Sequence, residues 1–193
     1  MPRVKLFDEN EVLTKAMNLF WKEGYSATSM QDLVNHMGIN RASIYDTFGD
    51  KEKLFLKAFE HYRKTNSEGI VRFFESQPDV KKGFELLFEN AIEEAVTDQE
   101  NKGCFVVNTT TELIPGDPKV YGIIEENRKT FEGLFFAYLK EGENKGQFEK
   151  GKDLKAIATL LFTLYNGMKV VSKVHSDKKE LMQSVLQVLT LLK

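Results

Sequence analysis

Apolar residues recur at helical spacing along most of the chain. The first such stripe consists of Val12, Ala16, Leu19 and Phe20. Their i, i+4, i+7, i+8 spacing is typical of one face of a helix. Asp8 or Asn10 can cap the start of this helix, and Gly24 is expected to end it. The pattern predicts an amphipathic first helix that buries one face.

Two short helical patterns follow, separated by Gly38. Thr28 is expected to be the N-cap of the first, with Gln31 three residues later completing a capping box. Asn40 is expected to cap the second, and Gly38 supplies the positive φ of a tight turn. The two patterns predict a helix-turn-helix, whose second helix exposes the polar side chains of residues 40–47 for the DNA major groove.

The rest of the chain also reads as helices. An amphipathic pattern from Asp50 to Ser76 predicts a connecting helix of about 40 Å. We expect an all-α fold of about nine helices, with a helix-turn-helix domain at residues 1–49 and a larger ligand-binding and dimerisation domain at residues 50–193. Residues 104–113 (CFVVNTTTEL) stay ambiguous on propensity alone, because they are β-branched enough for a strand.

The last two helical patterns are rich in apolar residues, and the first of them is apolar nearly all round. Such a helix must be covered on every side, and one subunit of this size easily covers only one side. Two helices from each of two subunits would form a four-helix interface. The alternative is a central helix buried within one subunit. The predicted interface residues are Leu160, Leu164, Met168, Leu181, Val185, Val188, Leu189 and Leu192.

Charge and composition narrow the class of protein. The net charge is −2, and residues 1–64 hold ten Lys and Arg against nine Asp and Glu, so contact with DNA would depend on local placement of cations. Arg3 and Lys5 could form a minor-groove arm or a frayed terminus. The single Cys104 excludes an internal disulfide. Without a signal peptide or a run of roughly 18 apolar residues, we expect a cytoplasmic protein with no membrane partner.

Catalytic and metal-binding motifs are absent from the sequence. The three His residues are far apart, and there is no HExxH, CxxC, phosphate loop or GxSxG. We therefore expect no enzyme activity, no metal and no cofactor. An all-helical enzyme with a site near Asn108 and Glu112 is a disfavoured alternative.

The helix-turn-helix segment resembles the DNA-binding domain of TetR/AcrR-type bacterial transcriptional regulators. The matching residues are Gly24, Tyr25, Thr28, Leu33, Val34, Gly38, Ile39, Tyr45, Phe48, Lys51 and Leu54. The resemblance implies a homodimer that binds a pseudo-palindromic double-stranded DNA operator, usually as a repressor, and a small-molecule effector in the C-terminal domain. It also implies that residues 104–113 are helical. A helical protein-binding module without DNA binding is the alternative, supported only by the near-neutral charge of the N-terminal domain.

The resemblance also implies a set of DNA-contacting residues. Two departures stand out, since many relatives carry Gly in place of Ala42 and His or Tyr in place of Thr47. Asp46 would weaken binding near phosphate but could read a cytosine amino group, and the sequence leaves both open. The predicted DNA-binding residues are Thr28, Ser29, Gln31, Asn40, Arg41, Ala42, Ser43, Tyr45, Asp46, Thr47 and Lys51.

The 15 Phe residues suggest a roomy aromatic interior in the second domain. Any one aromatic there can equally be plain core. Asn108 stands out as an amide among apolar residues, where it could bind a ligand or bridge two helices. The candidates for lining a ligand cavity are Phe84, Phe88, Cys104, Phe105, Asn108, Tyr121, Phe131, Phe135 and Tyr165.

Overall fold

The structure, a computed structural model, describes residues 7–100, 102–114 and 116–192. The all-α prediction is confirmed. Arg3 and Lys5, the predicted arm, lie outside the described residues. Within the described part of the chain, the helices are α1 (Glu9–Glu23), α2 (Met30–Met37), α3 (Arg41–Phe48), α4 (Lys51–Glu75), α5 (Val80–Thr97), α6 (Phe105–Leu113), α7 (Pro118–Asn144), α8 (Leu154–Val171) and α9 (Lys178–Val188), followed by the short 3-10 helix η1 (Leu189–Leu192).

The ends of the first helices are set by side-chain caps. Asp8 accepts hydrogen bonds from two N–H groups at the start of α1, and Asn40 and Asp50 cap α3 and α4 in the same way. The capping box of α2 differs from the prediction, because Ser29 is the N-cap and Asp32 its partner. Gly38 adopts a left-handed conformation with φ of 72°, which makes the tight turn into α3.

The buried residues form two separate cores. The first packs α1, α2 and α3 around the N-terminal half of α4, and the start of α6 joins it. We call this unit, α1 to α3, the head. The second core packs α5, α7, α8 and α9 with the C-terminal half of α4. Both cores use α4, between Leu54–Phe59 and Ile70–Phe74 respectively, so the helix that begins at the predicted domain boundary is shared by both units.

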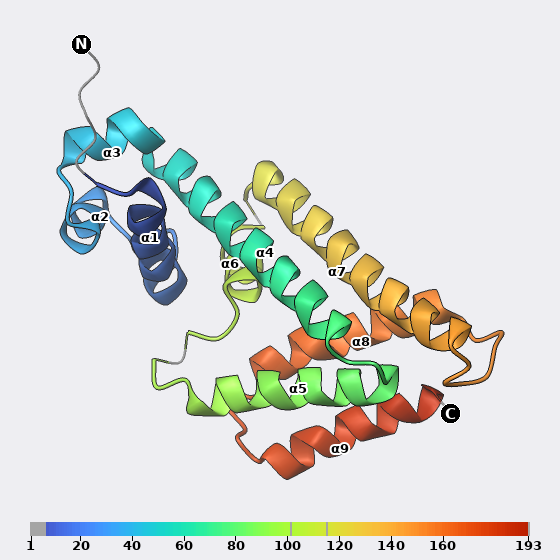
Figure 1. The fold of residues 1–193 in the computed structure, drawn as a ribbon. Helices are drawn as coiled ribbons and strands as arrows, with labels where there is room; N and C mark the ends of the chain where they lie inside the picture. The colour runs from blue at the N-terminus through green and yellow to red at the C-terminus, as the bar shows by residue number, and fades with distance from the viewer. Residues whose placement is uncertain (1–6, 101, 115, 193) are drawn as a thin grey trace.

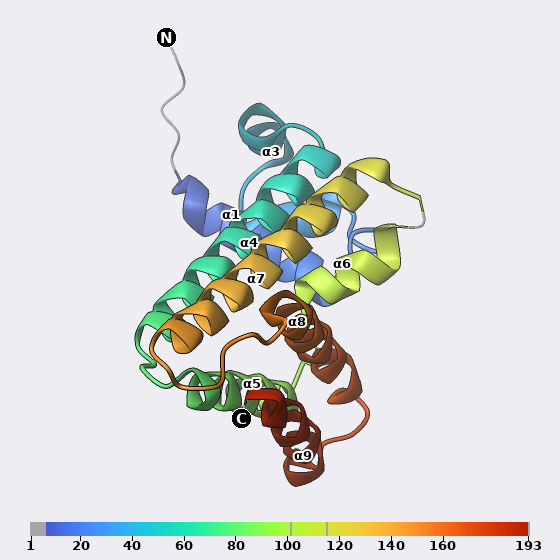
Figure 2. The same cartoon turned by 90° about the vertical axis from the view of Figure 1, so that its right-hand side faces the viewer.

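Helix α4 connects the two cores as a strut of 25 residues, about 37 Å long. It runs from the head to the helices of the second core, which we call the bundle (α5, α7, α8 and α9). Helix α7 lies beside it, as two views show (Figures 1 and 2). The buried Arg63 ties these helices together. Its guanidinium lies 2.6 Å from Glu60 on α4 and 3.1 Å from Glu126 on α7, and it donates to Asn127 at 3.4 Å.

Phe105, the first residue of α6, is inserted into the core of the head. Its ring packs edge-on against Phe59 at 5.2 Å and Tyr62 at 5.5 Å, and it stacks on Trp21 at 6.3 Å. Aromatic rings at these distances and angles attract one another beyond the gain from burial alone. Because Trp21 is on α1 and the other two are on α4, the start of α6 links the head to the rest of the chain.

Helix α8 is not covered on all sides within the protomer. Leu161 and Tyr165 face the core, whereas Leu160 is 42% exposed and Val171 is 45% exposed. The alternative of a central helix buried within one subunit is therefore wrong. Among the described residues, α8 is the one helix long and apolar enough to cross a membrane, which corrects the expectation that no such run exists. Core helices of soluble proteins pass the same test, and α8 packs against α5, α7 and α9.

The predicted interface residues divide by burial. Leu160 is exposed, and Leu164 and Val188 are half-buried, so their side chains can reach a partner subunit. The other five point into the protomer's own second core, because α9 lays its apolar face against α5 and α8. For these five the prediction is wrong: Met168, Leu181, Val185, Leu189 and Leu192.

We predict that Phe105→Ala lowers the free energy of unfolding by about 3–5 kcal/mol, since it removes a buried aromatic ring and leaves a cavity in the core of the head. Urea unfolding at fixed protomer concentration measures the change. Tyr121→Ala is the control, because Tyr121 is 57% exposed and its truncation should change stability by less than about 0.5 kcal/mol. Equal effects of the two substitutions would contradict the role of Phe105.

Candidate DNA-binding surface and ligand cavity

Helix α3 presents a polar outer face at the tip of the head. Ile44 and Phe48 are buried beneath it, which fixes the rotation of the helix, and Tyr45 is 47% exposed. Asn40 holds the N-terminus by accepting a hydrogen bond from the Ser43 N–H at 2.8 Å. The predicted residues of this helix all reach the surface: Arg41, Ala42, Tyr45 and Asp46 are exposed, and Ser43 and Thr47 are half-buried.

The start of α2 lies beside this face and corrects one predicted contact. Thr28 is 2% exposed, and its hydroxyl donates to the Gly24 carbonyl at 2.6 Å. Thr28 therefore supports the α1–α2 connection and cannot reach a DNA phosphate. Ser29 and Gln31 are exposed, as predicted for contacts. The Ser29 hydroxyl donates to Asp32 at 2.6 Å, and this bond lowers the pKa of the Asp32 carboxyl.

The cations near α3 are few but accessible. Arg41 lies on the first turn of α3 and forms no ion pair with any residue that the structure describes. Lys51 holds its ammonium 4.4 Å above the Tyr25 ring, within reach of the same surface. Lys57 donates to the Thr47 carbonyl at 3.4 Å, where a positive charge complements the C-terminus of α3.

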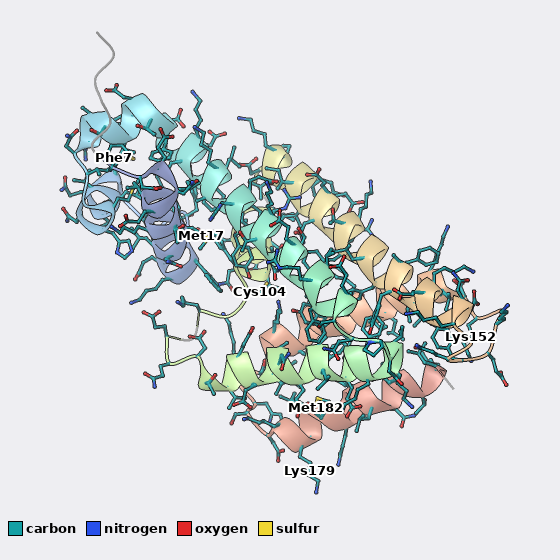
Figure 3. All side chains as sticks on the ribbon, viewed as in Figure 1. Phe7, Met17, Cys104, Lys152, Lys179 and Met182 are labelled. Atoms are coloured by element: carbon teal, nitrogen blue, oxygen red, sulfur yellow. The ribbon has the colours of Figure 1, made fainter. Side chains whose placement is uncertain are left out.

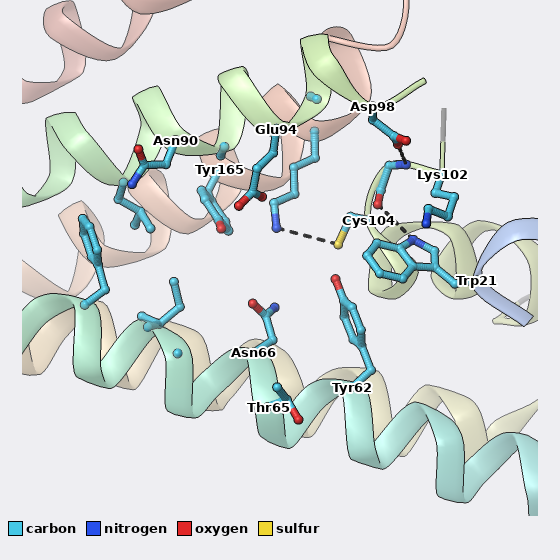
Figure 4. Close-up of a pocket in the computed structure, with 18 of the residues that line it drawn as sticks. Trp21, Tyr62, Thr65, Asn66, Asn90, Glu94, Asp98, Lys102, Cys104 and Tyr165 are labelled. Carbon is cyan, nitrogen blue, oxygen red and sulfur yellow. Dashed lines mark hydrogen bonds between the residues drawn. The ribbon is translucent and has the colours of Figure 1, made fainter. Parts of the chain in front are cut away.

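A cavity of about 810 Å³ lies where the head meets the bundle. It is lined from α1, α4, α5 and α8 and from the loop before α6 (Figure 4). Met17 and Cys104, which line it from opposite segments, are both marked near the middle of the molecule in Figure 3. A volume of this size is typical of sites for drug-sized ligands.

Two of the nine predicted ligand residues, Cys104 and Tyr165, line this cavity. Four predicted Phe residues fill the second core instead, and Phe105 fills the first. Asn108 donates to the Lys102 carbonyl at 2.7 Å and so orders the loop before α6, and Tyr121 is exposed on α7. None of these seven predicted residues lines the cavity: Phe84, Phe88, Phe105, Asn108, Tyr121, Phe131 and Phe135.

Polar groups from α4 and α8 meet in the cavity around Cys104. The Lys169 ammonium lies 4.0 Å from Cys104 Sγ and 4.2 Å from the centre of the Tyr165 ring. Burial lowers the pKa of Lys169, but its proximity to Cys104, Tyr165 and Glu94 raises it by more, so the pKa ends above the ordinary value. The Tyr62 hydroxyl points toward Cys104 (Figure 4), and burial raises the pKa of Tyr62 well above its usual value. Lys169 is therefore a cation and Tyr62 a neutral hydroxyl at neutral pH.

Hydrogen bonds join both ends of the segment around α6 to the head. Before the helix, Trp21 Nε1 donates to the Gly103 carbonyl at 2.9 Å. Near its C-terminus, the Glu112 carboxylate accepts hydrogen bonds from the N–H groups of Tyr25 at 3.1 Å and Ser26 at 2.7 Å. Both contacts join residues more than seventy positions apart, so the segment around α6 is bonded both to α1 and to the α1–α2 loop.

Comparison with known proteins finds one family over both parts of the chain. Residues 12–58 match the profile described as bacterial regulatory proteins, tetR family, and residues 84–188 match that of the tetracyclin repressor-like C-terminal domain. The HTH-type transcriptional regulator YezE of Bacillus subtilis (strain 168) is 31% identical over 186 residues, 96% of each chain. The chain belongs to the TetR family.

Two further relatives connect this TetR-family chain to DNA. The HTH-type transcriptional repressor ComR of Escherichia coli (strain K12) is 28% identical over 183 residues, 94% of this chain and 87% of ComR. A cysteine-substituted form of the TetR family transcriptional regulator CifR, complexed with 26-base-pair operator DNA, superposes with a TM-score of 0.86 at 26% identity and covers 99% of this chain and 100% of that one. The protein is therefore a DNA-binding transcriptional regulator, of a family without enzyme activity.

Several residues of this TetR-family cavity escaped sequence reasoning. No local pattern marks Trp21 or Tyr62 as a cavity residue, because their shared cavity depends on how α1 meets α4. Lys169 did carry a signal, since it interrupts the last turn of a helix that is otherwise largely apolar. Among the described residues no group of three or more His, Cys, Asp or Glu could hold a metal ion.

We predict that Ser29→Ala moves the pKa of Asp32 upward toward its ordinary value of 3.8, because the variant removes the hydroxyl that stabilises the carboxylate. NMR titration of the side-chain carboxyl measures the shift. Since the folded-state pKa lies below the unfolded one, Asp32 stabilises the wild type above about pH 4, and this contribution is lost as the pH falls. The variant should show a weaker dependence, because the backbone N–H of residue 29 can still donate to the Asp32 carboxylate. An unchanged pKa would contradict the capping box, and Ser67→Ala, at an exposed serine within α4, is the control.

Proposed function

We propose that this protein is a homodimeric repressor that binds a pseudo-palindromic operator and is released from it by a small molecule held in the cavity. The observation that carries the proposal is the position of the cavity, which has Trp21 of the head on one wall and Tyr165 of the bundle on another. A ligand there touches both units at once. A head that reads DNA and a bundle that binds an effector are thereby coupled in one chain.

The DNA-reading role is supported by the outer face of α3. Arg41 and Tyr45 extend from a helix whose inner face is anchored in the core, so their positions are fixed before DNA arrives. Arg41 is suited to a base edge or a phosphate, and the Tyr45 hydroxyl to a phosphate. The buried Thr28 is left out of the proposed DNA contacts. The proposed contacts are Ser29, Gln31, Asn40, Arg41, Ala42, Ser43, Tyr45, Asp46, Thr47 and Lys51.

The dimer is supported by an uncovered apolar stripe on α8. Ala156, Leu160, Gly167 and Val171 recur along one side of the helix and are all exposed in the protomer. The small residues at two of these positions let another helix approach closely. Leu186 of α9 is also exposed, so α8 and α9 of two subunits can bury these side chains together.

Release is supported by the connections between the cavity and the head. The Gly103 carbonyl, bonded to Trp21, is part of the cavity wall, and α6 begins two residues later with Phe105 in the head's core. A ligand that displaces this segment shifts the head relative to α4. Reading heads of a dimer must sit about 34 Å apart to occupy successive major grooves, so a small shift is enough to weaken binding. Because it acts on bacterial DNA, the cytoplasm is the proposed location.

We predict that the protein shifts a DNA fragment from upstream of its own gene in a gel assay, and that Arg41→Ala weakens binding by about 1–3 kcal/mol if Arg41 contacts a base. A phosphate contact would instead lower the salt dependence of log K by about one. Lys155→Ala, which removes one positive charge from exposed α8, should bind like the wild type. Absence of sequence-selective, salt-sensitive binding by the wild type would refute the proposal.

We predict that Leu160→Glu converts the dimer to a monomer, because each two-fold interface would bury the new carboxylate twice. Size-exclusion chromatography with light scattering measures the mass. Tyr121→Glu, which places the same charge at an exposed side chain of α7, should leave the dimer intact. A dimeric Leu160→Glu protein would move the interface away from this stripe.

A further inference from the structure

Lys169 is a cation in the cavity wall that forms no ion pair with any residue that the structure describes. Its ammonium contacts Cys104 Sγ at 4.0 Å (the dashed line in Figure 4) and the face of the Tyr165 ring at 4.2 Å. The sulfur of a cysteine is a weak acceptor and an aromatic face carries no formal charge. Among the residues that the structure describes, no carboxylate oxygen lies within 4.0 Å of this ammonium.

Three other charged groups of the wall already have partners. Lys102 pairs with Glu100 at 2.9 Å and lies over the Trp21 ring, and Arg72 lies 3.9 Å from Glu68. Asp98 accepts hydrogen bonds from the backbone N–H groups of Glu100 and Gly103, both at 3.1 Å. These charges serve the fold.

Glu94 is the remaining acid that faces this part of the cavity (Figure 4). Its side chain is exposed and therefore hydrated, so its charge reaches Lys169 only weakly. It is nevertheless close enough to favour the charged lysine and to repel a second anion placed beside it. Removal of the Glu94 charge should therefore strengthen the binding of an anion at Lys169.

Lys169 is half-buried, and an ammonium without an ion-pair partner at such a position is costly to fold around. A leucine or methionine would pack against Tyr165 without that cost. The lysine becomes favourable when an anion enters the cavity, because the attraction between the two charges is strong where little water separates them. The wall also offers large apolar and aromatic side chains to an apolar body, among them Trp21, Ile70 and Leu87.

We propose that the effector is an amphipathic organic acid, whose carboxylate pairs with Lys169 while its aliphatic or aromatic body lies along Trp21 and Tyr62. This proposal rests on the proposed function, since it gives the chemical class of the molecule that the cavity would bind. The Tyr62 hydroxyl, held neutral and aimed at the same region, can donate a second hydrogen bond to the carboxylate.

The chain provides its own reporter for the test. Trp21 is the only tryptophan and lines the cavity, so its fluorescence reports binding in the full-length protein. The probes are two acids, decanoate and 4-phenylbutanoate, each compared with its neutral amide of nearly the same shape. We expect each acid to bind at least about tenfold more tightly than its amide, as a charge-assisted hydrogen bond in a dry site allows.

Three variants assign the preference to Lys169. Lys169→Met keeps the length and apolar stem of the side chain and should bind acid and amide equally. Lys169→Arg keeps the charge and should retain the preference. Lys155→Met makes the same change at an exposed position of the same helix and should behave as the wild type. Glu94→Gln should bind the acids more tightly and the amides unchanged. Circular dichroism confirms that each variant is folded.

The outcomes separate this proposal from the proposed function. It is wrong if neither acid changes the fluorescence of Trp21, if amides bind as tightly as acids, or if Lys169→Met keeps the preference for acids. Binding to operator DNA is measured separately in the absence of any ligand. A protein that binds DNA but ignores the acids fails only this proposal, whereas one that prefers the acids but binds no DNA fails only the proposed function.

Discussion

The structure depends on the burial of one ring from α6 in the core of the head. Phe105 packs against Trp21 of α1 and against Phe59 and Tyr62 of α4, so three segments that are distant in sequence share one aromatic cluster. Trp21 and Tyr62 of this cluster also line the cavity, and Phe105 directly follows Cys104, another lining residue. Stability of the head and shape of the cavity thus follow from the same contacts.

This arrangement makes α1 of the head part of the cavity wall. A helix-turn-helix of short helices buries little surface by itself, and here it borrows the N-terminal half of α4 and the start of α6 to complete its core. Polar bonds then set its orientation, since Glu112 holds the N–H groups of the α1–α2 loop and Trp21 holds the Gly103 carbonyl. The cavity and the head are therefore in direct contact, through Trp21 of α1.

The electrostatic picture is one of local placement. The chain is slightly acidic overall, and the DNA-reading face carries Arg41 beside Asp46 rather than a field of positive charge. Binding of this kind relies on fixed positions and on helix N-termini, which a rigid, well-capped α3 provides. Local placement also distinguishes the cations of the cavity wall. Among the described residues, Lys102 and Arg72 are paired with carboxylates, whereas Lys169 forms no ion pair.

The helices and turns that depend on features of neighbouring residues could be predicted from the sequence alone. Caps such as Asp8, Asn40 and Asp50, the left-handed Gly38 and the apolar stripes fixed the helices and the exposed face of α3 within a few residues. Where two neighbouring residues suit the same role equally well by local criteria, the folded structure is needed to tell which of them fills it. Ser29 rather than Thr28 caps α2, because the Thr28 hydroxyl finds the Gly24 carbonyl inside the fold. Likewise, most of the predicted cavity aromatics lie in the core, and the cation Lys169 lies in the cavity wall. The crossing of α1, α4 and α8 decides this, and it is set by packing between distant segments, which periodicity along one segment does not encode.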